Sequence, residues 1–130
     1  MNNPSRERTA LVVDDEALIR WSVSETLGGL GFAVAQAPDG ATAISAITGA
    51  RLAFDVVVLD LRLPDVDDLS LLRRVRELLP AAVLVLMTAF GTAEVVANAR
   101  RIGVAGILNK PFELDELSRL IASAAGASTN

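Results

Sequence analysis

The hydrophobic pattern alternates short apolar runs with longer amphipathic stretches, five times along the chain. The apolar runs fall at about residues 9–13, 32–36, 55–59, 83–87 and 106–109. Their length and their β-branched residues favour strands over fragments of helix. Apolar residues at helical spacing follow most runs, and the clearest sets are Ile19, Val23, Leu27 and Leu30; Leu69, Leu72, Val75 and Leu79; and Leu114, Leu117, Ile121 and Ala124. The second and fourth helices are marked more weakly.

Helix-ending and helix-starting residues agree with this pattern. Gly31 and Gly103 stand where a glycine in the left-handed conformation would close a helix. Residues 38–40, Pro-Asp-Gly, open the second helix, Pro80 stops the third, and Thr92 can cap the fourth. Strands that alternate with helices over short connections predict right-handed crossovers and a parallel sheet. The fold class is therefore α/β.

Composition limits the chain to one domain of ordinary globular character. It has 130 residues, of which 52% are hydrophobic, enough for one core but not for two. No apolar run approaches the roughly 20 residues that a membrane helix needs. We expect an N-terminal tail at residues 1–8, a domain at 9–125, and a tail or the start of a linker at 126–130. The first residues lack the apolar stretch of a signal peptide, so we expect a cytoplasmic protein.

The charge distribution argues against nucleic-acid binding by this segment. The net charge is −4, and the eleven arginines are spread along the chain, whereas a nucleic-acid surface requires clustered Lys and Arg. Arg73, Arg74 and Arg76 form the densest basic group, which is either a solvated helix face or a surface for a partner. The chain has no cysteine, histidine or tyrosine, so covalent chemistry must fall on a carboxylate, a hydroxyl or its single lysine, Lys110.

Polar residues gather where the predicted strands end. Asp14 and Asp15 follow the first strand, Asp60 ends the third, Thr88 ends the fourth, and Lys110 follows the fifth. The carboxyl ends of parallel strands form the crevice in which α/β proteins bind ligands. Three carboxylates that lie together there cannot all stay ionised without a large free-energy cost unless a cation is bound. They therefore predict a divalent metal site. A lysine and a hydroxyl beside them suit a phosphoryl group.

Each of these residues also has a plain structural interpretation. One of Asp14 and Asp15 can cap the following helix, which leaves the other to face the crevice. Asp60 can cap the next loop, although a charged group after four branched apolar residues is costly to bury unpaired. Near a metal it can instead be the nucleophile that forms an acyl phosphate. Lys110 would pair with Asp60 and then with the phosphoryl oxygens. Pro111 after it is a candidate for a cis peptide bond.

The residues at these strand ends resemble a known family. Leu-Val-Val-Asp14-Asp15-Glu16, Val-Val-Leu-Asp60, Leu-Met-Thr88-Ala89 and Leu-Asn-Lys110-Pro111-Phe112 are similar to the receiver domain of two-component response regulators, most closely the nitrogen-regulator type. The resemblance covers about residues 8 to 125. It implies a flavodoxin-like (βα)5 fold, a three-layer sandwich whose five strands have the order 2-1-3-4-5.

The resemblance also implies roles for individual residues. Asp60 would accept a phosphoryl group from a histidine kinase or phosphotransfer protein. Asp15, Asp60 and the backbone carbonyl of Arg62 would bind Mg²⁺ or Mn²⁺, with Asp14 assisting. Thr88 would bond a phosphoryl oxygen and shift the loop that begins at Ala89, and Lys110 would form the ion pair. Such a domain is a phosphoacceptor rather than a turnover enzyme.

The chain departs from the family at several positions. Ile107 stands where receivers usually carry an aromatic residue that moves with the threonine, so we expect Phe90 or repacking at the fourth helix to replace that coupling. Asp68 replaces a usual glycine, which implies either a positive φ or a reshaped loop. Arg62 and Phe90 are bulky and can flank the phosphoryl group, where we expect them to slow its hydrolysis.

Two other functions compete with this interpretation. Haloacid-dehalogenase-type enzymes also use an aspartate nucleophile, but they need a second aspartate at the position held by Arg62. A receiver-like binding module that acts without phosphorylation is the other alternative. As partners besides the kinase or phosphotransfer protein, we expect an output domain after Asn130 that controls transcription, or a second copy in a homodimer through the fourth and fifth helices. The segment contains no helix-turn-helix, so we expect no direct contact with nucleic acid or membrane.

Overall fold

The computed structural model describes residues 7–50 and 53–128, which form five strands alternating with five helices. The strands are β1 (Thr9–Val13), β2 (Ala33–Ala37), β3 (Val56–Asp60), β4 (Val83–Thr88) and β5 (Gly106–Asn109). The helices are α1 (Ala17–Gly29), α2 (Gly40–Gly49), α3 (Ser70–Leu78), α4 (Ala93–Ile102) and α5 (Leu114–Ser128). All neighbouring strands are parallel, in the order β2-β1-β3-β4-β5. The predicted α/β fold and strand order are confirmed.

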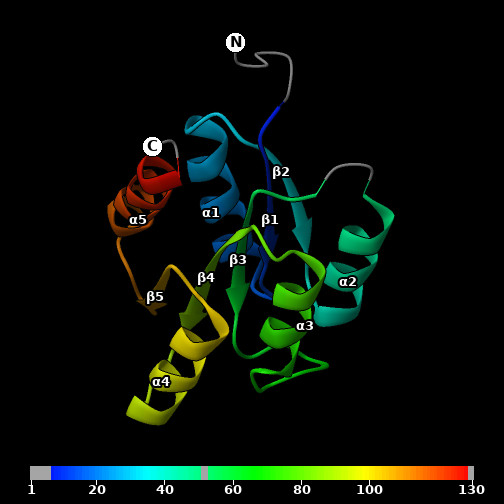
Figure 1. Ribbon diagram of the computed structural model, residues 1–130, viewed down its shortest axis with the longest axis vertical. Helices are drawn as coiled ribbons and strands as arrows, with labels where there is room; N and C mark the ends of the chain where they lie inside the picture. Colours follow the sequence, from blue (N-terminus) through cyan, green and yellow to red (C-terminus); the bar gives the residue numbers. More distant parts are fainter. Residues whose placement is uncertain (1–6, 51–52, 129–130) are drawn as a thin grey trace.

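Two layers of helix cover the sheet, as Figure 1 shows. Helices α1 and α5 pack on one face, and α2, α3 and α4 lie on the other. Successive residues of each central strand face opposite layers, so Val57 and Leu59 join one core cluster while Val56 and Val58 join the other. All five residues of β3 are buried. Because both faces of β3 are covered, its sequence is a continuous apolar run that brings Asp60 to the edge of the core.

The predicted helix boundaries are largely confirmed. Asp39 and Thr92 cap α2 and α4, and each side chain accepts a hydrogen bond from the backbone N–H three residues later. Gly31 and Gly103 have positive φ values of 98° and 109°, the conformation for which glycine was predicted at both helix ends. The Lys110–Pro111 peptide bond is cis.

Two details of α5 differ from the sequence prediction. Leu114 was expected on the inner face, but it is 40% exposed, whereas Leu117 and Ile121 of the same helix are buried. The helix also continues to Ser128, into the segment expected to be a tail. Its alanines favour helix strongly enough to offset Gly126, which costs about 1 kcal/mol. Most of the other expected tail, residues 1–8, lies outside the described residues.

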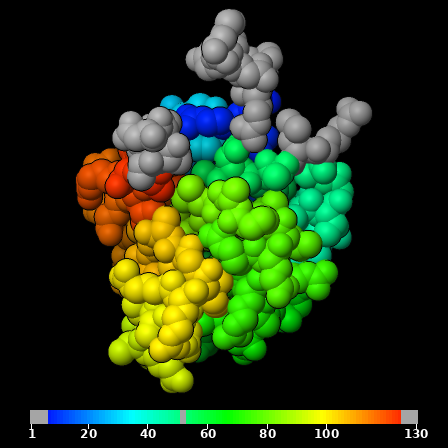
Figure 2. Space-filling model, in the orientation of Figure 1, coloured from blue at the N-terminus to red at the C-terminus, as the bar shows by residue number. Residues whose placement is uncertain are grey.

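Arg76 joins the ends of α3 and α4. Its Nη1 donates to the backbone carbonyls of Leu79, Pro80 and Ala82, and its Nη2 donates to that of Gly103 at 2.9 Å. Figure 2 shows the surfaces of α3 (green) and α4 (yellow) side by side. Leu79 and Gly103 are the C-cap residues of α3 and α4, and Pro80 and Ala82 lie in the turn after α3. Carbonyls at and after a helix end have no partner within the helix, so the guanidinium supplies hydrogen bonds that they would otherwise lack. Arg76 therefore has a structural role, unlike its neighbours in the arginine group.

We expect Arg76→Gln to lower the free energy of unfolding by about 2 kcal/mol, because charge-assisted hydrogen bonds are lost and one glutamine amide cannot reach both helix ends. Urea unfolding followed by circular dichroism measures the change. Arg74→Gln, an exposed arginine on the same helix, is the control and should change it by less than about 0.5 kcal/mol. Equal effects of the two variants would contradict a specific role for Arg76.

Candidate functional site

The crevice at the carboxyl ends of β1, β3 and β4 brings together the predicted carboxylates. Asp14 is fully buried and Asp60 is 6% exposed, whereas Asp15 is exposed to solvent. β1 and β3 are neighbouring strands, with Val13 paired to Leu59, so the residues that follow them meet directly. Two buried carboxylates at adjacent strand ends repel each other, and a cation must compensate them.

Lys110 supplies that cation in this structure. Its Nζ lies 2.9 Å from Asp14 Oδ2, 2.9 Å from Asp60 Oδ2 and 3.0 Å from Glu16 Oε1. Burial by itself would lower the pKa of Lys110, but the bonds to the three carboxylates outweigh it and raise that pKa, so the ammonium stays charged. Burial raises the pKa of Asp14, and the bond from Lys110 offsets part of the rise. The predicted pairing of Lys110 with Asp60 is present.

Asp14 and Asp60 are held by hydrogen bonds within their own loops, and neither Asp14 nor Asp15 is a helix cap. Neither Asp14 nor Asp15 caps α1, because Glu16 occupies the N-cap position. Asp14 Oδ1 does accept the Glu16 backbone N–H at 2.8 Å, and Asp60 Oδ1 accepts that of Arg62 at 3.2 Å. These bonds fix one oxygen of each carboxylate and leave the other for Lys110. The two side chains are therefore oriented by their own loops toward the centre of the crevice.

Thr88 and the loop after it form the opposite side of the crevice. Thr88 is 2% exposed, and its Oγ1 accepts the backbone N–H of Phe90 at 3.1 Å, which ties the hydroxyl to the loop through Ala89. The Phe90 ring is 69% exposed, and the Arg62 guanidinium carbon lies 5.6 Å from its centroid. This cation–π contact joins the loops after β3 and β4 across the site. Arg62 and Phe90 therefore lie together, as expected of residues that flank the crevice.

The two departures from the family have different outcomes. Ile107 pairs in register with Leu86 and packs, half-buried, against the core cluster that α4 shares. Its place on β5, beside β4 and against the core cluster to which α4 contributes, is compatible with repacking at α4. No described residue other than glycine has a positive φ, so Asp68 does not adopt the glycine-like conformation. Asp68 instead accepts the backbone N–H of Ser70 just before α3, which supports the reshaped loop.

The donor set of the site fits a divalent metal. Carboxylate oxygens of Asp14, Asp15, Glu16 and Asp60 lie within 4.8 Å of one another. Hard divalent cations such as Mg²⁺ prefer oxygen ligands and are bound through a few carboxylates with water completing the shell. The proximity of these oxygens, together with the buried Asp14 and Asp60, matches that chemistry. Whether the Arg62 carbonyl joins them stays a prediction.

Two acidic residues with defined contacts were missed by sequence reasoning. Glu16 belongs to the motif after the first strand, where the sequence indicates no role for it, although its carboxylate binds Lys110. Asp65, in the loop after β3, accepts the backbone N–H groups of Gly40 and Ala41 at 2.9 Å each, and these bonds lower its pKa. The position of Glu16 directly after two aspartates is a sequence signal for its contact. The contact of Asp65 depends on how the loop after β3 approaches α2, and no local sequence pattern indicates that.

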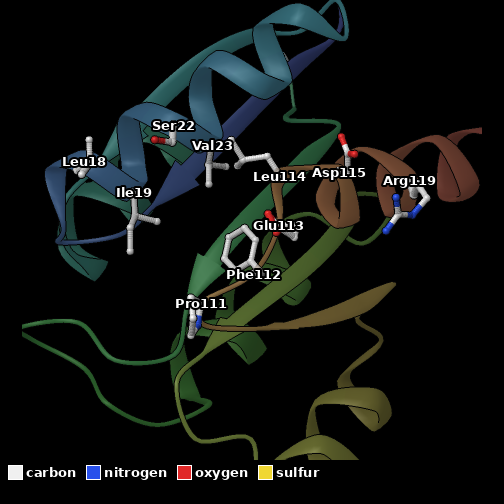
Figure 3. Close-up of a pocket in the computed structure, with 10 residues that line it drawn as sticks. All are labelled: Leu18, Ile19, Ser22, Val23, Pro111, Phe112, Glu113, Leu114, Asp115 and Arg119. Carbon is white, nitrogen blue, oxygen red and sulfur yellow. The ribbon is translucent and has the colours of Figure 1, made fainter.

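A groove of about 760 Å³ lies beside the crevice, between α1 and the connection from β5 to α5 (Figure 3). It begins at Pro111, directly after Lys110, and Leu18 on α1 and Leu114 on α5 line it. Leu18 is 73% exposed, and Trp21, one turn further along α1, is 57% exposed. Large apolar side chains this exposed beside a polar crevice are characteristic of a binding surface.

Comparison with known proteins decides the family. Residues 10–122 match the response regulator receiver domain. The chain belongs to this family. It is 33% identical over 113 residues to the DNA-binding transcriptional regulator NtrC of Escherichia coli, covering 87% of this chain and 24% of that protein. It is 30% identical to sporulation initiation phosphotransferase F of Bacillus subtilis, covering 82% of this chain and 85% of that protein.

Solved receiver structures agree with the fold. The chemotaxis response regulator CheY4 of Vibrio cholerae has a TM-score of 0.80 at 28% identity, covering 91% of this chain and 98% of that one. The receiver domain spans only about a quarter of NtrC and 54% of the regulator FixJ of Bradyrhizobium diazoefficiens, to which it is 34% identical. Within residues 7–50 and 53–128, no helix is both long and apolar enough to cross a membrane.

Proposed function

We propose that this receiver domain accepts a phosphoryl group on Asp60 from a phosphohistidine of a partner protein. The observation that carries the proposal is the pairing of the buried Asp60 and Asp14 with Lys110, at 2.9 Å each, at the edge of the sheet. A purely structural aspartate would not need a second buried carboxylate and a lysine beside it. The receiver family to which the chain belongs is a family of phosphoacceptors, and the chain supplies no histidine of its own.

The transfer has a simple balance of bonds. The P–N bond of the phosphohistidine breaks, and a P–O bond to the Asp60 carboxylate forms an acyl phosphate. The leaving ring nitrogen keeps the electron pair of the broken bond and takes up a proton. Lys110 then bonds a phosphoryl oxygen, and the Thr88 hydroxyl donates to another. Thr88 Oγ1 also accepts the Phe90 N–H, so movement of the hydroxyl toward the phosphoryl group would shift the loop that begins at Ala89.

The residues that would hold the cation are Asp14, Asp15, Asp60 and the backbone carbonyl of Arg62. Mg²⁺ or Mn²⁺ held there would supply positive charge that lowers the repulsion between the Asp60 carboxylate and an incoming phosphoryl group. Asp60 keeps its orientation through the bond from the Arg62 N–H. The acyl phosphate would then be lost slowly by hydrolysis, so the domain would act as a phosphoacceptor rather than as a turnover enzyme.

The exposed groove is where we place the partner. A kinase or phosphotransfer protein must bring its histidine to the mouth of the crevice, and the groove adjoins that mouth at Pro111. The relatives NtrC and FixJ are transcriptional regulators longer than this chain, which supports a transcriptional output domain beyond Asn130. A cytoplasmic location is part of the same proposal. Dimerisation through the α4 and α5 face is the alternative output.

Beryllofluoride, a phosphoryl mimic, tests the proposal. We expect the mimic with Mg²⁺ to change the fluorescence of Trp21, the single tryptophan, in a saturable way, and we expect Asp60→Asn to abolish the change. The DrrB receiver domain, 30% identical with a TM-score of 0.75, has been solved in a BeF3-activated form. If the wild-type domain bound neither metal nor mimic, the receiver-like binding module would be the better account.

The Arg62–Phe90 contact gives a prediction about the lifetime of the acyl phosphate. We expect the Arg62→Asn, Phe90→Ala double variant to lose phosphate about tenfold faster, because two bulky side chains no longer obstruct the water in line with the P–O bond. Loss of the phosphorylated species over time, measured by intact mass, checks the rate. Arg74→Asn, an exposed arginine away from the crevice, is the control. A longer lifetime in the double variant than in the wild type would contradict the obstruction.

A further inference from the structure

Glu16 uses its carboxylate in an unusual way for its position. It is the N-cap residue of α1, but its side chain makes no capping hydrogen bond. Its Oε1 instead accepts from Lys110 Nζ at 3.0 Å, across the crevice from a residue 94 positions away. The Glu16 backbone is held at the same time, because its N–H donates to Asp14 Oδ1. The side chain is therefore directed to Lys110 by its loop rather than by the helix end.

The three contacts of Lys110 exhaust its hydrogen-bond donors. An ammonium has three N–H groups, and here Asp14, Glu16 and Asp60 accept from the same nitrogen. For Lys110 to bond an oxygen of a phosphoryl group on Asp60, one of these carboxylates must give up its contact. The question is which of the three can be released at the lowest free-energy cost.

The three carboxylates differ in burial, and this difference decides which contact is released. The side chains of Asp14 and Asp60 are 0% and 7% exposed, whereas that of Glu16 is 58% exposed. A buried carboxylate that loses its cation stays uncompensated, while an exposed one is rehydrated by solvent. The contact between Glu16 and Lys110 is therefore the one that a phosphoryl oxygen would replace.

We infer that Glu16 is a positioning residue that occupies, in the resting domain, the donor of Lys110 which the phosphoryl group takes over. This inference rests on the proposed function. Glu16 holds the ammonium at the mouth of the crevice, and phosphorylation replaces its Oε1 with a phosphoryl oxygen. Glu16 thus competes with the phosphoryl group for Lys110. The strength of the Glu16–Lys110 contact therefore contributes to how tightly the site holds a phosphoryl group.

Affinity for beryllofluoride measures this competition. At Mg²⁺ concentrations that saturate each variant, we expect Glu16→Gln to bind beryllofluoride about two- to fivefold more tightly, the range for loss of an exposed ion pair. Glu16→Asp should bind it more tightly as well, because its side chain is one methylene shorter and better suited to cap α1. Glu25→Gln, an exposed glutamate on α1, removes the same charge and should match the wild type.

A second measurement follows the contact itself. Lys110 is the only lysine, so lysine-specific isotope labelling gives one side-chain NMR signal. Both Glu16 variants should shift that signal in the resting domain, and beryllofluoride should shift it in the wild type, while Glu25→Gln should leave it in place. An unshifted signal in the Glu16 variants would overturn the inference. So would wild-type affinity in Glu16→Asp with tighter binding in Glu16→Gln, since charge repulsion alone would then explain the result.

The outcomes also separate this inference from the proposed function. If the wild type and all Glu16 variants bind beryllofluoride equally, the phosphoacceptor role stands and the competition by Glu16 fails. If neither the wild type nor any variant binds it, while Asp60→Asn behaves identically to the wild type, the proposed function fails, and this inference fails with it.

Discussion

Lys110→Met is expected to make the stability of the domain depend on a divalent cation. Without metal, the variant leaves the buried carboxylates of Asp14 and Asp60 with no counter-charge, which should lower the free energy of unfolding by about 3 kcal/mol. The methionine side chain fills much of the same space, so the loss of charge dominates. Denaturant unfolding in the presence of a chelator measures the difference.

Mg²⁺ should then restore most of the stability that the Lys110→Met variant loses in chelator. Binding at about 100 times the dissociation constant stabilises a folded protein by about 2.7 kcal/mol. In the variant Mg²⁺ no longer shares the carboxylates with the lysine, so its stabilising effect should exceed that in the wild type. Arg100→Met, which removes an exposed cation on α4, should show neither the loss nor the enhanced response. If the variant and the wild type had equal stability in chelator, the ammonium would not be what compensates the crevice.

The strand pattern was sufficient to predict the sheet and most of the site. Each central strand is a continuous apolar run because helices cover both of its faces, so a charged residue at its end, such as Asp60, is conspicuous. Lys110 is conspicuous for a similar reason, as the only lysine and one that follows an apolar strand. These signals are local in sequence, and the parallel arrangement then brings them together.

What the sequence did not reveal depends on contacts between distant segments. Glu16 binds Lys110 only because the loops after β1 and β5 meet at the crevice. The four-carbonyl contact of Arg76 depends on the ends of α3 and α4 lying together, and a helix pattern shows an arginine only as polar. Leu114 fits the helical periodicity but lies on the groove instead of in the core. In each case the local sequence pattern is consistent with the structure, but contacts with distant segments determine the role of the residue.

The central claim is that the Asp60 carboxylate is the phosphoacceptor. Asp60→Asn should abolish acquisition of a phosphoryl group altogether, because a neutral amide is a poor nucleophile and also weakens the metal site. The residue is buried and bonded by Lys110, so the nearly isosteric asparagine should keep the fold. The alternative acceptors are the exposed Asp15 and Glu16 in the same cluster.

The most direct measurement locates the modified residue. The wild-type domain is incubated with Mg²⁺ and a small acyl phosphate, reduced with borohydride, which converts an aspartyl phosphate to homoserine, and analysed by peptide mass spectrometry. We predict homoserine at position 60 alone, no modification without Mg²⁺, and none in Asp60→Asn. Homoserine at Asp15 in the wild type, or continued phosphoryl uptake by Asp60→Asn, would contradict the account.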